Sequence, residues 1–191
     1  MLKSGGADPD RVALLAGVVK RSADNIYGLI EDIFDFVKSG HTHLRKERQP
    51  LEPLLEALAY QAKSIAPAKV ETLLAAEPGL ALSLDRRRLS RALFNLIKNA
   101  IEAMPTGGVL SLSARRAADT VEIEVADTGV GIEPERLERI WDQFYTHGKA
   151  QGTGLGMAIV KKIVEDHGWR VAARSTLGQG TAFTITAPAE E

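Results

Sequence analysis

The chain contains no cysteine, which excludes disulfides and thiolate metal sites and is compatible with a reducing compartment. It has no apolar run near the ~18 residues of a membrane-spanning helix, and its first residues lack the apolar core of a signal peptide. An excess of one charge is also missing: the formal net charge is -1, so nothing favours nucleic acid or an anionic membrane as a partner. The remaining composition, 45% hydrophobic and 26% charged in 191 residues, fits a globular domain with an appendage.

Residues 8–40 have the pattern of one long helix of roughly 45 Å. Apolar residues recur every seven positions in two series offset by four, as at the a and d positions of a helix seam. The series are Val12, Val19, Ile26 and Ile33, and Ala16, Ala23, Ile30 and Val37. A helix this long would overhang a domain of ~150 residues. We therefore expect residues 8–40 to form a homodimer, with packing on the chain's own domain as the alternative.

The next residues, 41–50, are predicted to be a linker. His41 and His43 have no further Cys or His near them in the sequence, so an exposed pair is favoured over a metal site. Residues 45–50 are charged and are expected to have no regular structure. The chain is thus divided into a segment over 1–47 and a domain over 48–191.

The domain is predicted to be α+β, a two-layer sandwich. Its mixed, mostly antiparallel sheet of five or six strands has helices on one face, and the long helix precedes it. Hydrophobic periodicity indicates helices at 53–65, 85–104, 134–141 and 154–166 and strands at 69–74, 79–84, 108–115, 120–126, 171–174 and 181–186.

Polar residues interrupt the apolar face of the helix at 85–104. Asn95 and Asn99 are four residues apart, so both amides point the same way. They indicate a polar site at the border of the core, with two exposed surface amides as the alternative.

Two glycine-rich stretches follow. DTGVGI at 127–132 leaves a strand, where a carboxylate beside main-chain amides can accept from an amino group such as that of adenine; a turn with a capping Asp is the alternative. GTGLG at 152–156 opens a helix, whose first amides can bind phosphate. It matches neither the Walker motif nor the dinucleotide fingerprint.

The order of these stretches is more specific than any one of them. NLIKNAIEAM, DTGVGI, WDQF, GTGLGMAIV and GQGTAF resemble the N, G1, F, G2 and G3 boxes of two-component sensor histidine kinases. That ATP-binding domain has the Bergerat fold and is shared more distantly with gyrase and Hsp90. The resemblance covers about residues 48–188, and NLIKNAIEAMPTGG is similar to the nitrogen-regulation type in particular.

The resemblance implies ATP and Mg²⁺ as cofactors. Asn99 would ligate Mg²⁺ through its amide oxygen, Asn95 would lie by the phosphates, and Asp127 would accept from the adenine amine beside Gly129 and Gly131. Phe144, with Trp141 beside it, would anchor a lid. The other cofactor-binding positions it implies are Lys98, Ile132, Lys149, Gly152, Thr153, Gly154, Leu155, Gly156 and Thr181.

The resemblance further implies a protein-histidine kinase, with Asn95 and Asn99 as its catalytic residues. Relatives that hydrolyse ATP carry a glutamate at the position of Asn95, and an amide cannot act as a general base. The chain is therefore expected to hold Mg-ATP and present the γ-phosphate to another nucleophile. The alternatives are a nucleotide-free module for dimerisation and docking, and an ATPase or serine kinase of the same superfamily.

The chain departs from the family at the acceptor histidine. None of His41, His43, His147 and His167 precedes an acidic residue, as the acceptor motif requires. Residues 8–40 instead resemble the second helix of the dimeric bundle, so the chain looks like a kinase cut between two helices and inactive alone. The expected partners are a second copy, the histidine-bearing helix and a response-regulator receiver domain. The expected location is cytoplasmic, in a full-length kinase that is free or membrane-attached.

Overall fold

The computed structural model describes residues 15–17, 19, 44–146 and 154–190. The helices and strands with labels, in chain order, are β1 (Glu47–Pro50), α2 (Leu51–Ile65), β2 (Val70–Ala76), β3 (Ala81–Leu84), α3 (Arg86–Glu102), β4 (Gly108–Ala117), β5 (Thr120–Asp127), α4 (Pro134–Leu137), α5 (Gly156–Asp166), β6 (Arg170–Thr176) and β7 (Gly180–Pro188). None of the helices in this part of the chain has both the length and the apolarity to cross a bilayer.

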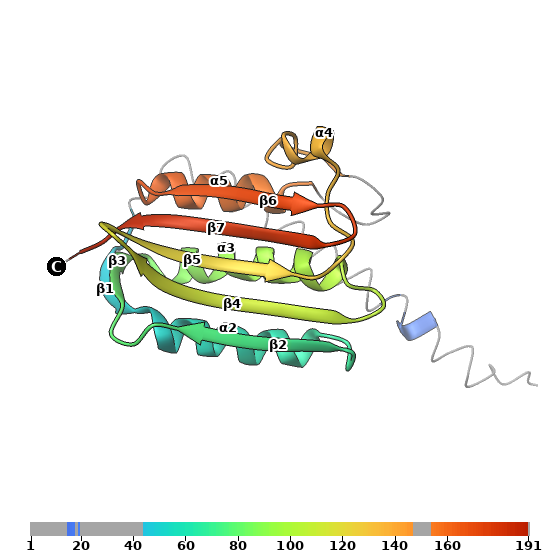
Figure 1. Cartoon of the computed structure of the whole chain (residues 1–191), viewed down its shortest axis with the longest axis horizontal. Helices are drawn as coiled ribbons and strands as arrows, with labels where there is room; N and C mark the ends of the chain where they lie inside the picture. The colour runs from blue at the N-terminus through green and yellow to red at the C-terminus, as the bar shows by residue number, and fades with distance from the viewer. Residues whose placement is uncertain (1–14, 18, 20–43, 147–153, 191) are drawn as a thin grey trace, which may run out of the picture.

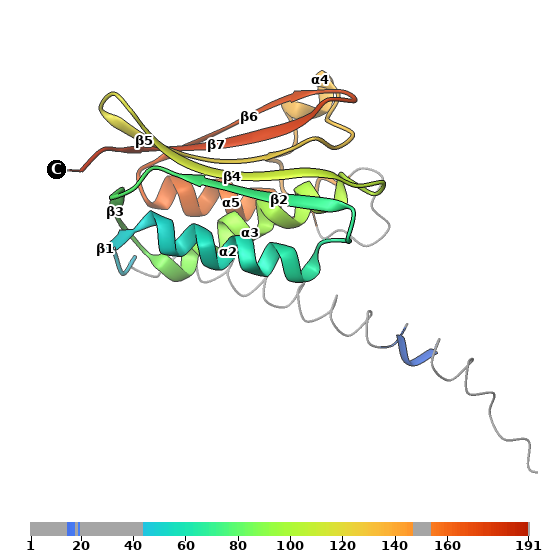
Figure 2. The ribbon, with the colours of Figure 1, turned by 60° about the horizontal axis from the view of Figure 1, so that its bottom comes forward.

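The domain has two layers, a sheet and the helices α2, α3 and α5 on one of its faces (Figure 2). The main sheet has the strand order β2-β4-β5-β7-β6 (Figure 1). β2 is parallel to β4, and the other neighbours are antiparallel. The predicted two-layer sandwich with a mixed, mostly antiparallel sheet is therefore confirmed.

The core lies between the sheet and the helices. On β5, Val121, Ile123 and Val125 are buried, whereas Glu122 and Glu124 between them are partly exposed. This period of two directs one face of the strand to the helix layer and the other to solvent. The helices α3 and α5 bury residues that recur with a helical period, and this apolar side of each helix packs toward the sheet.

Helix α3 begins where the sequence predicts. The Asp85 side chain accepts a hydrogen bond from the Arg88 main-chain N–H at 3.1 Å and so caps the first turn. Leu89, Leu93 and Leu96 are fully buried along one face. Asn95 and Asn99 are half-buried at the edge of this face, at the border of the core.

Two local predictions were wrong. Residues 45–50 are not only a linker, because β1 pairs antiparallel with β3 in a separate two-stranded sheet. This pairing uses main-chain groups of mostly exposed polar residues, so it leaves no apolar period in the sequence. Helix α4 ends at Leu137, well before Trp141, and its four residues bury none of their side chains. The prediction for residues 8–40 lies almost wholly outside the described residues.

Candidate active site

Asp127 is the last residue of β5 and is buried, with 7% of its surface exposed. Its Oδ1 accepts a hydrogen bond from the main-chain N–H of Gly129 at 2.8 Å. Burial raises the pKa of the Asp127 carboxyl, and hydrogen bonds from the main-chain N–H groups of Gly129 and Thr181 oppose that rise. A partly desolvated carboxylate at a strand end is a strong acceptor for a ligand N–H.

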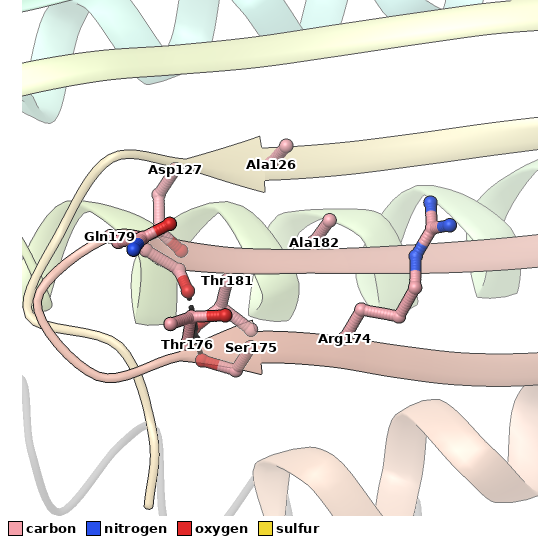
Figure 3. Close-up of a pocket in the computed structure, with 9 residues that line it drawn as sticks. Ala126, Asp127, Arg174, Ser175, Thr176, Gln179, Thr181 and Ala182 are labelled. Carbon is pink, nitrogen blue, oxygen red and sulfur yellow. Dashed lines mark hydrogen bonds between the residues drawn. The ribbon is translucent and has the colours of Figure 1, made fainter.

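A row of three polar residues crosses the end of the sheet. Asp127 on β5 lies opposite Thr181 on β7, and Thr181 lies opposite Ser175 on β6. Neighbours in register point to the same face, and Asp127 and Thr181 are buried, so the row faces the helices. Figure 3 shows these residues at the adjacent ends of the three strands. Thr181 was predicted in the site, whereas Ser175 was missed.

The loop at 127–132 is held between α3 and the β6–β7 turn. The Val130 N–H donates to the carbonyl of Ala103, just after α3, at 3.0 Å, and the Val130 carbonyl accepts from Gly178 at 2.7 Å. Gly131 has a φ of +70°, and a Cβ there would collide with the carbonyl oxygen of Thr176. Glycine at 131 is thus required for the loop to close on this turn.

Asn95 and Asn99 face the first turn of α5. The Nδ2 of Asn95 donates to the Gly156 carbonyl at 3.4 Å, and the Nδ2 of Asn99 contacts the sulfur of Met157 at 3.1 Å. The structure therefore brings together the asparagine pair and Gly156, which lie about sixty residues apart in the chain. Lys98, on the same helix, is exposed.

Phe144 meets the second glycine stretch through its main chain. Its N–H donates to the Gly154 carbonyl at 3.0 Å, and a Cβ on Gly154 would collide with the Phe144 main chain. Phe144 itself has a φ of +62° and a side chain that is 70% exposed. Such a conformation is strained for a bulky residue and is typical of functional loops.

The other predicted positions have different outcomes. The Leu155 side chain is buried in the core, and its place in the cofactor site stays a prediction. The main-chain N–H of Ile132 donates to Ser175 Oγ at 2.8 Å, which ties Ile132 to the polar row. Trp141 packs edge-on against Phe183, with 6.1 Å between the ring centres. Lys149, Gly152 and Thr153 lie outside the described residues.

A depression of about 240 Å³ lies beside the ends of the same strands. Ala126, Ala182 and Arg174, which line it, form the next cross-strand row, and this row faces away from the helices. The Arg174 side chain extends over β7 (Figure 3), and its guanidinium pairs with Glu124 at 3.3 Å. Asp127, Ser175 and Thr181 line the depression as well, so it adjoins the polar row at the end of the sheet.

The side chain that could hold a metal ion here is an amide, that of Asn99. Over residues 44–146 and 154–190, no three or more His, Cys, Asp or Glu side chains gather as a metal site. Mg²⁺ accepts oxygen ligands and commonly takes few from protein and the rest from phosphate and water. The amide oxygen of Asn99 fits this ion when a nucleotide supplies the remaining ligands.

Comparison with known proteins gives consistent matches. Residues 84–191 match the model of the "Histidine kinase-, DNA gyrase B-, and HSP90-like ATPase" family. The sensor histidine kinase ZraS of Escherichia coli (strain K12) is 34% identical over 176 residues, which are 91% of this chain and 37% of that protein. This chain thus spans less than two fifths of that relative.

Solved structures agree with the family match. Full-length ShkA in complex with AMPPNP has a TM-score of 0.80 and 28% identity, over 98% of this chain and 41% of that one. The histidine kinase ThkA, solved in complex with the response regulator TrrA, has a TM-score of 0.78 over 98% of this chain and 54% of that one. Its identity is 20%, so that likeness concerns the fold alone.

Proposed function

The chain belongs to the family of histidine kinase-, DNA gyrase B- and HSP90-like ATPases, and from this premise we propose that it is the ATP-binding part of a sensor histidine kinase. It binds Mg-ATP and transfers the γ-phosphate to a histidine that lies outside this sequence. The phosphoryl group then passes to an aspartate of a response regulator. Sensor histidine kinases among its relatives support the kinase class.

One observation carries this proposal: Asn95 and Asn99 meet the first turn of α5, next to the sheet end that bears Asp127. A nucleotide in this corner would place its base against Asp127 and its phosphates between α3 and the start of α5. Asp127 accepts from the amine of the base, and main-chain amides at the start of α5 bind phosphate oxygens. Gly152, Thr153 and Gly154 would lie along the same phosphates.

Asn99 would hold Mg²⁺ through its amide oxygen, with Asn95 beside the phosphates. When bound, the ion neutralises charge on the transferring phosphoryl group. Lys98 and Lys149 would add positive charge around the phosphates. Since Asn95 cannot take a proton from water, these residues position the nucleotide for an incoming imidazole and do not promote hydrolysis.

A second candidate is a nucleotide-free docking module. The intact glycine stretches and Asn99 speak against it, because such a module has no need of close main-chain approach to phosphate. An ATPase or serine kinase of the superfamily would call for Glu at position 95, where this chain has Asn.

The first test is calorimetric titration with ATP and a non-hydrolysable analogue, with and without Mg²⁺, together with phosphate release. We expect Mg²⁺ to tighten binding and release to be negligible. Asn99→Ala is expected to lower the affinity measured with Mg²⁺ about tenfold, because the ion loses an oxygen ligand. Asn99→Asp, which keeps an oxygen, should retain the Mg²⁺ effect.

Gln61→Ala is the matched control, because it removes an exposed amide from α2, on another helix. Rapid phosphate release without a partner would favour the ATPase and contradict the role given to Asn95. Absence of nucleotide binding at millimolar concentration would favour the docking module.

We further propose that the chain divides into a dimerisation segment at 1–47 and a catalytic domain at 48–191. Ile26→Asp places a charge in the middle of the predicted seam, so we expect dimers to dissociate while nucleotide affinity stays unchanged. Light scattering across a concentration series measures this. An unchanged mass would mean that the seam packs within one chain.

A further inference from the structure

Ser175 has no role in the family motifs described above, yet its hydroxyl contacts three groups at the end of the sheet. It accepts from the main-chain N–H of Ile132 at 2.8 Å. It lies 2.8 Å from the carbonyl oxygen of Gly180 and 2.9 Å from the hydroxyl oxygen of Thr181. Ser175 therefore joins the loop at 127–132 to β7.

These contacts determine where each proton lies. The Gly180 carbonyl can only accept, so the single Ser175 proton is donated to it. The Ile132 N–H can only donate, so it occupies one lone pair of Ser175. The contact with Thr181 is then a hydrogen bond only if Thr181 donates its own proton to Ser175. One arrangement satisfies all three contacts.

Because the Thr181 proton is donated to Ser175, the Thr181 hydroxyl can only accept a hydrogen bond from a ligand. Its neighbour in the row, the ionised Asp127 carboxylate, also only accepts. The end of the sheet thus offers two acceptors on adjacent strands and no hydroxyl donor from Thr181. A ligand group placed there is bound well if it donates and is rejected if it accepts.

We propose that Ser175 is a positioning residue that makes the site selective for a 6-aminopurine over a 6-oxopurine by holding the Thr181 hydroxyl as an acceptor. This inference rests on the proposed nucleotide site. Adenine carries an amine with two N–H donors at its 6-position, whereas hypoxanthine carries a carbonyl that only accepts. Without Ser175, the Thr181 hydroxyl can rotate and donate to that carbonyl.

The test compares ATP with inosine triphosphate, both with Mg²⁺, by calorimetric titration of the whole chain. We expect Ser175→Ala to lower the ratio of the two affinities about tenfold, the effect of one hydrogen bond whose direction is no longer imposed. Ser175→Thr keeps the hydroxyl and should keep the ratio. Ser113→Ala, on the face of β4 away from the helices, is the matched control.

A double variant tests whether Ser175 acts through Thr181 or only by holding the loop at 127–132 in place. In Thr181→Val, which has no hydroxyl to orient, Ser175→Ala should leave the affinity ratio unchanged. If Ser175 acts only by holding Ile132, its loss weakens both nucleotides equally in either background, and the proposal is overturned. Thermal unfolding of each variant confirms that it is folded.

If the wild-type chain binds neither nucleotide, the result contradicts both the proposed function and this inference. A wild-type chain that binds ATP, with an unchanged ratio in Ser175→Ala, removes the inference alone.

Discussion

Asp127→Asn is expected to lower nucleotide affinity by about a hundredfold, the loss that follows when a charge-assisted hydrogen bond to a ligand disappears. The carboxylate is buried and already held by the Gly129 N–H, so it is oriented before a ligand binds. An amide in this position also presents an N–H₂ group that opposes the adenine amine. Calorimetric titration with Mg-ATP measures the loss.

The same substitution should not weaken the fold at neutral pH. Burial raises the folded-state pKa of Asp127 above its ordinary value of 3.8, so the folded chain binds this proton more tightly than the unfolded chain. Stability from that proton is present at low pH and is lost as pH rises through the folded pKa. At pH 7 the ionised carboxylate therefore costs stability, which Asp127→Asn relieves.

Asp119→Asn provides the control, because Asp119 is exposed at the turn between β4 and β5. It should change neither affinity nor melting temperature. Nucleotide affinity that survives in Asp127→Asn would place the base elsewhere. A melting temperature that falls at pH 7 would mean that the carboxylate stabilises the loop more than its burial costs.

His167→Ala is expected to destabilise the domain by about 3 kcal/mol, from a cavity and two lost hydrogen bonds. His167 is 3% exposed at the end of α5. The Asp85 N–H donates to its Nε2 at 3.0 Å, so Nδ1 carries the proton and donates to the Ile163 carbonyl at 2.7 Å. The ring also packs on Trp169, with centres 4.9 Å apart.

These contacts tie the end of α5 to the start of α3, at the end of the helix pair away from Asn95 and Gly156. Lys46, just before β1, adds a bond from its Nζ to the His167 carbonyl at 2.8 Å. Denaturant unfolding measures the loss of stability, and Glu165→Ala, at an exposed position of the same helix, is the control. Equal stability of His167→Ala and wild type would show that the helix pair does not depend on this ring.

The pH dependence of stability distinguishes the effect of a buried neutral imidazole from the effect of packing alone. Burial lowers the pKa of His167 below its ordinary value of 6.5, and the charges of Lys46 and Arg88 lower it further, against the Ile163 carbonyl and Asp85. The unfolded chain then binds this proton more readily, so stability is full above about pH 6.5 and falls as pH drops through the unfolded pKa. The stability difference between wild type and His167→Ala should therefore shrink as the pH is lowered from 7.5 to 5.

Sequence patterns predicted most of the elements because their signals are local. The period of two in β4 and β5 and the helical period in α3 each depend on burial of one face. Asp85 was predictable as a cap, and the glycines at 129 and 131 marked a close main-chain approach. The order of the glycine stretches and the asparagine helix was specific enough to indicate the family.

Other features left no such signal. The strand β1 pairs through main-chain groups of polar residues, so its sequence resembles a linker. His167 was one histidine among four, and only the packing of α5 against α3 brings Asp85 to its ring. Side-chain type alone does not distinguish a buried histidine from an exposed one.

By itself, the amino-acid sequence determined the two-layer class, the order of elements and the candidate residues for a nucleotide, because these follow from short-range periodicity and motif order. Only the tertiary structure decided that Ser175, Thr181 and Asp127 form one row and that Asn95 meets Gly156. The register of β6, β7 and β5 sets that row, and a shift of one residue would turn it to the opposite face. Register and helix packing depend on contacts far apart in the chain, which no local pattern encodes.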